Sequence, residues 1–147
     1  MQENTIEDPP KPPHVHADLL GKIVEVNTLA AFTENEVNTH IHEANIHVQD
    51  EYKRGLLKRS CEAALGARHD IEAITGRAPE LDDREAIGDL LNEAQRKLGD
   101  LQYHSESIIV RGGFKMPSFC YTEAEVKEAE QARQDAETMF SNYHYRL

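Results

Sequence analysis

Residues 34–75 decide the expected architecture, and their sequence is ENEVNTHIHEANIHVQDEYKRGLLKRSCEAALGARHDIEAIT, without a proline. Its apolar residues recur at intervals of three, four or seven positions, which is the spacing of one face of an α-helix and not of a strand. They are Val37, Ile41, Ala44, Val48, Tyr52, Leu56, Ala63, Ala67, Ile71 and Ile74. A single helix of this length would extend about 60 Å. We therefore predict one long helix over residues 34–75, part of which protrudes or pairs with another subunit.

The segment before the long helix also has helical spacing. Apolar residues lie on one face of residues 17–32, which predicts a first helix. Thr33 followed by Glu36 matches a capping box, so a new helix is expected to begin at residue 34. The alternative is one continuous helix, because an apolar heptad passes through the junction without a change of phase. Its members are Ile23, Ala30, Val37 and Ala44.

Two more helices are expected after the long one. Gly76 ends the long helix, Asp82 begins a helix over residues 83–110, and Thr122 begins the last one over residues 122–143. The connection after Gly76 is only about six residues long, so the helices on either side of it fold back as an antiparallel hairpin. We predict an all-α fold, an antiparallel bundle of three or four helices built on the long helix.

The expected hairpin leaves part of the long helix without a partner. It places Tyr52 opposite Ile108, near the end of the second hairpin helix. Residues 34–50 are therefore expected to need cover from helix 17–32 or from another chain.

Residues 1–13 are expected to form an extended arm in front of the bundle domain, which spans residues 14–147. This segment has almost no apolar side chains, and it contains Pro9, Pro10, Pro12 and Pro13. Such a composition is typical of polyproline-like segments. The four prolines are candidate contacts with a partner or a neighbouring subunit.

Composition and charge disfavour several functions. The chain of 147 residues carries a net charge of −11, from 27 acidic and 16 basic residues, which disfavours general attraction to nucleic acid. No apolar run is long enough to cross a bilayer, and the first residues do not resemble a signal peptide. Cys61 and Cys120 are not in metal-ligand spacing. We expect a cytoplasmic protein, or one inside a virus particle assembled there, that is not an enzyme and has no cofactor.

One stripe of the long helix has residues suited to metal binding. Its members are spaced by four, three and four positions, and they are Glu36, His40, Glu43 and His47. Two carboxylates and two imidazoles on one helix stripe could bind a divalent metal, with His14 and His16 completing the site if the first helix folds back. Neither the Glu-x-x-His nor the His-Glu-x-x-His motif is present. A subunit contact, a pH-sensitive stripe and a solvated flank are the alternatives.

Glycines inside two expected helices indicate a possible packing surface. Gly55 and Gly66 are eleven residues apart, as are Gly88 and Gly99, so each pair lies on one side of its helix. Each glycine costs about 1 kcal/mol relative to alanine. The uncharged face of helix 83–110 consists of Gly88, Asn92, Gln95 and Gly99. We expect another helix or subunit to pack closely there, and simple tolerance of glycine is the alternative.

Two further clusters are candidate interaction sites. The loop 111–121 contains four large side chains that either close the end of the bundle or anchor in a partner: Phe114, Met116, Phe119 and Tyr121. The densest basic cluster consists of Lys53, Arg54, Lys58 and Arg59. We expect it to be a solvated face that pairs with Asp50, Glu51 and Glu62 on the same helix, and recognition of an acidic partner or a nucleic acid is the alternative.

The sequence favours a non-catalytic structural or assembly protein. It is expected to form a homo-oligomer, in the manner of a coiled coil, or to be a subunit of a larger complex such as a virus particle. The expected contacts are the long helix, the N-terminal arm and the loop 111–121. The alternative is a metal-binding helical bundle that uses Glu36, His40, Glu43 and His47. A weaker alternative is an acidic inhibitor that mimics nucleic acid.

Overall fold

The computed structural model describes residues 14–47, 50–111 and 121–142, and in the helices the side chains of 43–47 and 107–111 lie outside that description. The described chain is all-helical and has no strand: α1 (Ala17–His47), α2 (Glu51–Arg77), the short 3-10 helix η1 (Ala78–Glu80), α3 (Arg84–Arg111) and α4 (Glu123–Ser141). This confirms the prediction of an all-α bundle. The predicted arm over residues 1–13 lies outside the described residues.

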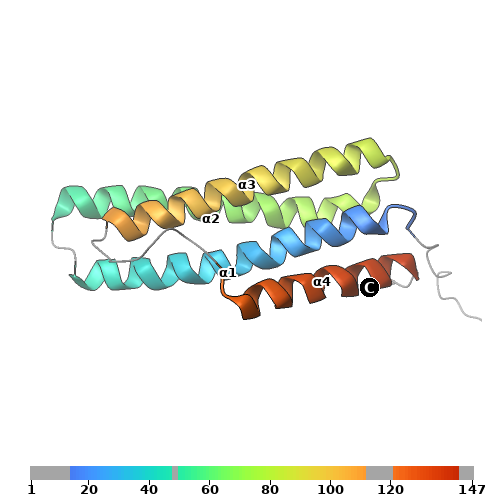
Figure 1. Cartoon of the computed structure of the whole chain (residues 1–147). Coiled ribbons are helices and arrows are strands. Elements are labelled where there is room, and N and C mark those ends of the chain that lie inside the picture. The colour runs from blue at the N-terminus through green and yellow to red at the C-terminus, as the bar shows by residue number, and fades with distance from the viewer. Residues whose placement is uncertain (1–13, 48–49, 112–120, 143–147) are drawn as a thin grey trace, which may run out of the picture.

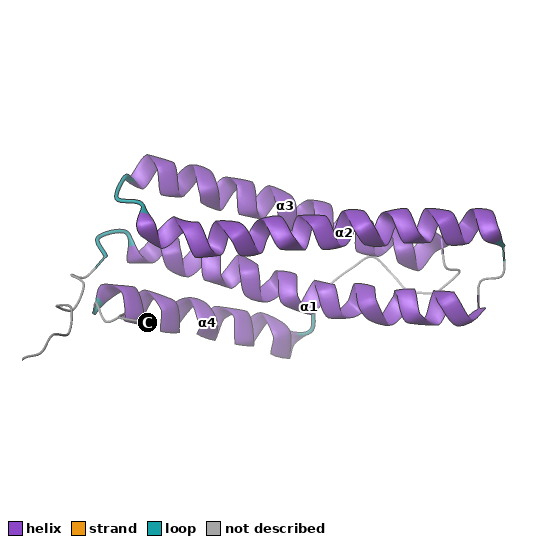
Figure 2. Cartoon of the chain, turned by 180° about the vertical axis from the view of Figure 1, so that it is seen from behind, coloured by secondary structure: helices purple, strands orange, loops and turns teal. Residues whose placement is uncertain are grey.

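Helix α1 is the central element of the bundle. It packs against α2, α3 and α4, whereas α4 has extensive contacts only with α1. The hairpin of α2 and α3 lies on one side of α1, and α4 lies along the N-terminal half of α1 on another side (Figure 1, Figure 2). The half of the molecule near the α1–α2 connection therefore contains three helices, and the other half contains four.

The prediction of a single helix over residues 34–75 is wrong. Helix α1 continues through Thr33, and the break comes just before α2, where the Asp50 carboxylate accepts hydrogen bonds from the backbone N–H groups of Tyr52 (2.8 Å) and Lys53 (3.4 Å). The Thr33 hydroxyl donates to the carbonyl of Leu29 (3.0 Å), a bond that a threonine makes inside a helix. The alternative of a continuous helix at this junction is confirmed.

Burial explains why Thr33 does not end the helix. Ala30 and Val37, the heptad positions on either side of it, are fully buried, and so is Thr33 itself. A helix cap contributes about 1 kcal/mol. Burial of a single valine or isoleucine side chain contributes about 1.5–3 kcal/mol, so a stripe of them outweighs one cap.

The position of the break also corrects the expectation that residues 34–50 need cover from helix 17–32 or from another chain. Helices α1 and α2 pack against each other, and α1 also packs against α3, so the second half of α1 lies against the α2–α3 hairpin (Figure 1). Among residues 34–42, whose side chains are described, Val37 belongs to the core and the exposed side chains are polar: Asn35, Asn38, Thr39 and His42. The chain itself therefore covers Val37 in this part of α1.

The apolar stripe of α2 agrees with the predicted one at Ala67, Ile71 and Ile74, which are buried, and differs from it in the first part of the helix. Leu57, Ala64 and Ile71 form the buried heptad, whereas Tyr52 is 71% exposed and Ala63 is also exposed. The predicted contact of Tyr52 with Ile108 is therefore wrong on the Tyr52 side. The reason is that α2 begins anew at Glu51, so its rotation is set by its own contacts with α1 and α3 and does not continue the stripe of α1.

The two last helices lie where helices 83–110 and 122–143 were expected. A capping box begins α4: the Thr122 hydroxyl accepts from the N–H of Glu125 (3.1 Å), and the Glu125 carboxylate accepts from the N–H of Thr122 (2.9 Å). The predicted cap of α3 at Asp82 is wrong by one residue, because the carboxylate of Asp83 accepts from the N–H of Ala86 (3.2 Å). Among the described residues, no helix is both long and apolar enough to cross a membrane.

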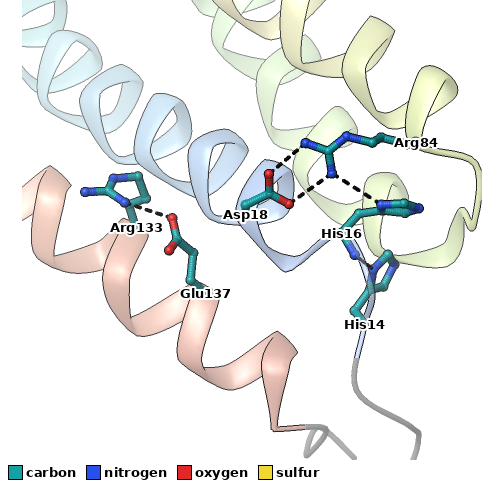
Figure 3. A network of polar contacts seen from close by, with 6 residues as sticks. All are labelled: His14, His16, Asp18, Arg84, Arg133 and Glu137. Atoms are coloured by element: carbon teal, nitrogen blue, oxygen red, sulfur yellow. Dashed lines mark hydrogen bonds and ion pairs between the residues drawn. The ribbon is translucent and has the colours of Figure 1, made fainter.

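Close approach of α1 and α4 occurs at Gly21, which is buried. A Cβ atom at this position would lie 2.9 Å from the backbone oxygen of Arg133 and would overlap the side chain of Glu137. The guanidinium of Arg133 holds that side chain by donating to the Glu137 carboxylate (2.8 Å), as Figure 3 shows, and it also lies 3.6 Å from Glu25. Glycine is therefore required at this crossing.

The substitution Gly21→Ala is expected to destabilise the fold. Overpacking costs about 1–3 kcal/mol, and the better helix propensity of alanine returns about 1 kcal/mol of it, so the expected net loss in the free energy of unfolding is up to about 2 kcal/mol, measured by urea unfolding. Gly66→Ala is the matched control, because a Cβ at Gly66 meets nothing within 4 Å. It is expected to stabilise the fold by about 1 kcal/mol. Equal signs for the two variants would contradict the close approach at Gly21.

Candidate functional site

Two histidines connect the start of α1 to the turn between α2 and α3. The backbone N–H of His16 donates to Nδ1 of His14 (3.1 Å), so the other ring nitrogen of His14, Nε2, carries the proton and donates to the carbonyl of Leu81 (3.0 Å). Nε2 of His16 donates to the carbonyl of Asp82 (2.9 Å). The N–H of His14 donates to the carbonyl of Phe140, near the end of α4 (2.7 Å). Three helix ends are therefore joined at one end of the bundle.

An ion pair completes this connection (Figure 3). The guanidinium of Arg84 donates to both carboxylate oxygens of Asp18, at 3.2 and 2.8 Å, and also approaches Nδ1 of His16 at 3.4 Å. The hydrogen bonds from Arg84 lower the pKa of Asp18 to about 2. We call the set of His14, His16, Asp18 and Arg84 the end latch.

The end latch corrects one part of the metal hypothesis. His16 and His40 are separated by nearly the whole described length of α1, about 36 Å at 1.5 Å per residue. His14 and His16 therefore do not complete a site with the Glu36 and His40 stripe, because α1 is one continuous helix and does not fold back at Thr33.

The end latch is expected to make stability depend on pH below 4. The pKa of Asp18 is depressed in the folded state from 3.8 to about 2, so its contribution is present above pH 3.8 and is lost as the pH falls through 2. The wild type is expected to be more stable than Arg84→Gln near neutral pH, and the difference should close over that window in urea unfolding. Asp18→Asn is the matched variant. In a chain that carries Asp18→Asn, the substitution Arg84→Gln should no longer cause a pH-dependent loss of stability. A gap that stays constant with pH would contradict the pairing.

A buried hydrogen-bond chain connects α1, α3 and the start of α4. The Thr33 hydroxyl donates its proton to the carbonyl of Leu29. In the 2.7 Å contact between the Thr33 and Tyr121 hydroxyls, the Tyr121 hydroxyl is therefore the donor. The Tyr121 oxygen accepts in turn from the side-chain amide of Gln102 (3.0 Å). Burial of the phenol raises the pKa of Tyr121.

This chain bears on the predicted interaction residues of the loop 111–121. Tyr121 is half-buried, and its hydroxyl bonds within the bundle, as in the alternative in which the loop closes the bundle. Phe114, Met116 and Phe119 lie outside the described residues, and their role as partner anchors stays a prediction.

The substitution Tyr121→Phe is expected to destabilise the fold by about 1 kcal/mol, because it removes the group that bonds both Thr33 and Gln102. The raised pKa of Tyr121 predicts a second measurable effect, a loss of stability in alkali. The stability that the protonated phenol provides is present below pH 10 and is lost as the pH rises above it, so the wild type should lose its advantage over Tyr121→Phe in alkali. Tyr103→Phe, which changes a 65% exposed tyrosine, is the control and should be neutral. Equal effects of the two substitutions on urea unfolding would contradict the buried chain.

The predicted metal stripe is described only in part. His40 is buried, with Nε2 3.8 Å from the Glu36 carboxylate. The side chains of Glu43 and His47 lie outside the described residues. Within the described part of the chain, no group of three or more histidine, cysteine or acidic side chains is placed to hold a metal ion. The metal site stays a prediction.

The predicted glycine face of α3 is open. Asn92, Gln95 and Gly99 are exposed, and a Cβ at Gly88 or Gly99 meets nothing within 4 Å. The helices of this chain therefore do not require glycine at either position. Packing of another helix or subunit on this face stays a prediction.

The basic cluster of α2 is exposed to solvent, as expected for a solvated face. Lys53, Arg54, Lys58 and Arg59 are all exposed, and none of them forms an ion pair with a carboxylate in the described part of the chain. The expected pairing with Asp50, Glu51 and Glu62 is therefore wrong. One cause is visible at Asp50, whose carboxylate caps the backbone of α2 instead.

A hollow of about 430 Å³ lies beside this cluster, between α1 and α2. We call it the basic hollow, and its lining residues are Ile41, Arg54, Gly55, Leu57, Lys58, Cys61 and Glu62. The floor is apolar, because Leu57 is buried and Ile41 and Cys61 are partly buried against the core. Arg54, Lys58 and Glu62 stand exposed around it.

The thiol of Cys61 is part of the apolar floor. Burial raises the pKa of Cys61, and the negative charge of Glu62 adds to this effect. A thiol with a raised pKa stays protonated near neutral pH and is a poor nucleophile. The basic hollow therefore offers an apolar surface beside two exposed cations, Arg54 and Lys58, and one exposed carboxylate, Glu62.

Sequence reasoning identified the cations but not the hollow. Arg54, Lys58 and Cys61 follow one another by four and three positions, which is a detectable signal for one helix face. The contribution of Ile41 depends on the antiparallel packing of α1 on α2. A prediction in which residues 41 and 57 belong to one helix cannot bring these residues together.

Comparisons with known proteins give no family for this chain. No protein-family model matches it, no curated protein matches it, and no solved structure matches it.

Proposed function

We propose that this chain is a non-catalytic assembly protein that forms homo-oligomers by docking an acidic protein surface on the basic hollow. The observation that carries the proposal is the cationic rim of Arg54 and Lys58, without an ion pair in the described chain, beside an apolar floor. The expected subunit contact through residues 34–50 is replaced in this proposal by a contact at the basic hollow.

The charge of the molecule supports an acidic occupant. The chain carries 27 acidic and 16 basic residues, so a cluster of four cations without carboxylate partners contrasts with the remaining surface. Arginine and lysine at such a surface attract carboxylates and slow the approach of other cations. The net charge of −11 disfavours general attraction to the closely spaced phosphates of a nucleic acid. An acidic protein segment with fewer charges is favoured.

The shape of the basic hollow supports a protein occupant with an apolar side chain. Residues that contribute most to binding at protein interfaces fill desolvated pockets and are surrounded by polar contacts. The floor at Leu57, Ile41 and Cys61 fits such a side chain, and Arg54 and Lys58 are in place for flanking carboxylates. Arginine can bind a carboxylate through two parallel hydrogen bonds.

The sequence-based contacts of the arm and the loop 111–121 remain part of the proposal. Both segments lie outside the described residues, apart from Arg111 and Tyr121. Membership of a larger complex, such as a virus particle, stays a hypothesis that rests on the sequence.

The double substitution Arg54→Glu with Lys58→Glu is expected to prevent self-association. The wild type should have a concentration-dependent mass above 16.7 kDa in sedimentation equilibrium, from low to high micromolar concentration and at physiological salt. The variant should stay at the monomer mass, because the reversed charges repel an acidic occupant.

The matched control is Lys22→Glu with Arg96→Glu, which makes the same change in net charge at exposed positions on α1 and α3. It should associate as the wild type does. A wild type that stays at the monomer mass throughout would contradict the proposed function. An equal loss in the control would show that net charge, and not the basic hollow, governs association.

A further inference from the structure

The outer surface of α4 carries an exposed apolar side chain between two exposed carboxylates, which complements the apolar floor and the cations of the basic hollow. Helix α4 has extensive contacts only with α1, so much of its circumference is exposed. Val126 is 41% exposed, one of four large apolar side chains with substantial exposure in the described chain. Glu123 and Glu130 are exposed on the same side of the helix, three residues before and four residues after Val126. We call Glu123, Val126 and Glu130 the acidic ridge.

The carboxylates of the acidic ridge are available for a partner. Glu130 forms no ion pair in the described part of the chain. Glu123 is 3.9 Å from Lys127, and both side chains are largely exposed. Exposed pairs of this kind contribute little, so Lys127 does not prevent exchange for another cation.

We propose that the occupant of the basic hollow is the acidic ridge of a second copy of this chain, an inference that rests on the proposed function. Val126 enters the apolar floor, and Glu123 and Glu130 pair with Arg54 and Lys58. The two cations are about 6 Å apart along α2, whereas Glu123 and Glu130 are about 10.5 Å apart along α4, and the long flexible side chains of arginine and lysine can span this difference. An exposed apolar side chain between two carboxylates thus meets an apolar hollow beside two cations.

The two surfaces cannot meet within one chain. The basic hollow lies in the three-helix half, near the α1–α2 connection, whereas α4 lies along the N-terminal half of α1 (Figure 1, Figure 2). Pairing of different surfaces on two copies is head-to-tail, and such an interface produces rings or open filaments. A series of oligomers is therefore expected and not a closed dimer.

The electrostatics of the contact allow a second copy to bind although both copies are acidic. At physiological salt the Debye length is about 8 Å, so the net charge of −11 on each copy is screened at the distance between their centres. Charges that meet in the contact are much closer than this and attract. The chain itself supplies both complementary surfaces at equal concentration.

Charge exchange tests the pairing. Lys58→Glu and Glu130→Lys are each expected to weaken association about tenfold in sedimentation equilibrium. The double variant should recover most of this loss, because the glutamate introduced at position 58 of one copy then meets the lysine introduced at position 130 of the other, and the pair is again of opposite charge. Asp135→Lys is the matched control on α4, because Asp135 is exposed outside the acidic ridge and bonds Gln131 on its own helix. It should associate as the wild type does.

A mixing experiment tests the head-to-tail geometry. Lys58→Glu damages the basic hollow and leaves the acidic ridge intact, whereas Val126→Asp does the reverse. At a concentration at which each variant alone is monomeric, an equimolar mixture should form a heterodimer and stop there, because only one intact pair of surfaces remains. Circular dichroism and urea unfolding should match the wild type, since Lys58 and Val126 are exposed.

The outcomes separate the inference from the proposed function. A wild type that associates, with Glu130→Lys and Val126→Asp unaffected, would overturn the inference and leave the proposed function in place. Failure of the double charge variant to recover association would also overturn the inference. A monomeric wild type would overturn both.

Discussion

Burial of one apolar stripe along α1 is the constraint on which the rest of the structure depends. Leu20, Ile23, Ala30 and Val37 are almost completely buried, and α1 is the helix that packs against all three others. Each large side chain in this stripe contributes about 1.5–3 kcal/mol, more than the cap that would have started a new helix at residue 34. Once α1 is continuous, α2 must return along it, and α4 finds its place on the side that Gly21 leaves free for close approach.

Polar contacts then fix where the helices begin and how they are aligned. The end latch joins the starts of α1 and α3, and the chain from Gln102 through Tyr121 to Thr33 joins α1, α3 and the start of α4. Single hydrogen bonds of this kind contribute about 1 kcal/mol net. Their larger effect is on register, because a shift of one helix would leave several buried groups without partners.

The shape of the bundle also determines which surfaces remain for other molecules. Helix α4 covers only half of α1, and the three-helix half carries the basic hollow. The cations of α2 are exposed on a chain with an excess of acidic residues, while α4 carries exposed carboxylates at the other half. The basic cluster and the acidic ridge lie on different halves of the molecule, and this arrangement is the physical basis of the directional contact that we propose between copies.

The sequence by itself determined that the chain is all-helical, because the three-to-four residue spacing, the glycines and the cap at Thr122 are local signals that do not depend on neighbours. It also contained the heptad Ile23, Ala30 and Val37, which supported the alternative of a continuous helix against the break that the cap at Thr33 predicted. Only the tertiary structure decided that the break comes before Asp50, that Tyr52 points to solvent, and that Ile41 joins Leu57 at the basic hollow. Caps at Thr33 and Asp50 are similar in local strength, and the choice between them depends on how much apolar surface each alternative buries between helices, which is a property of packing.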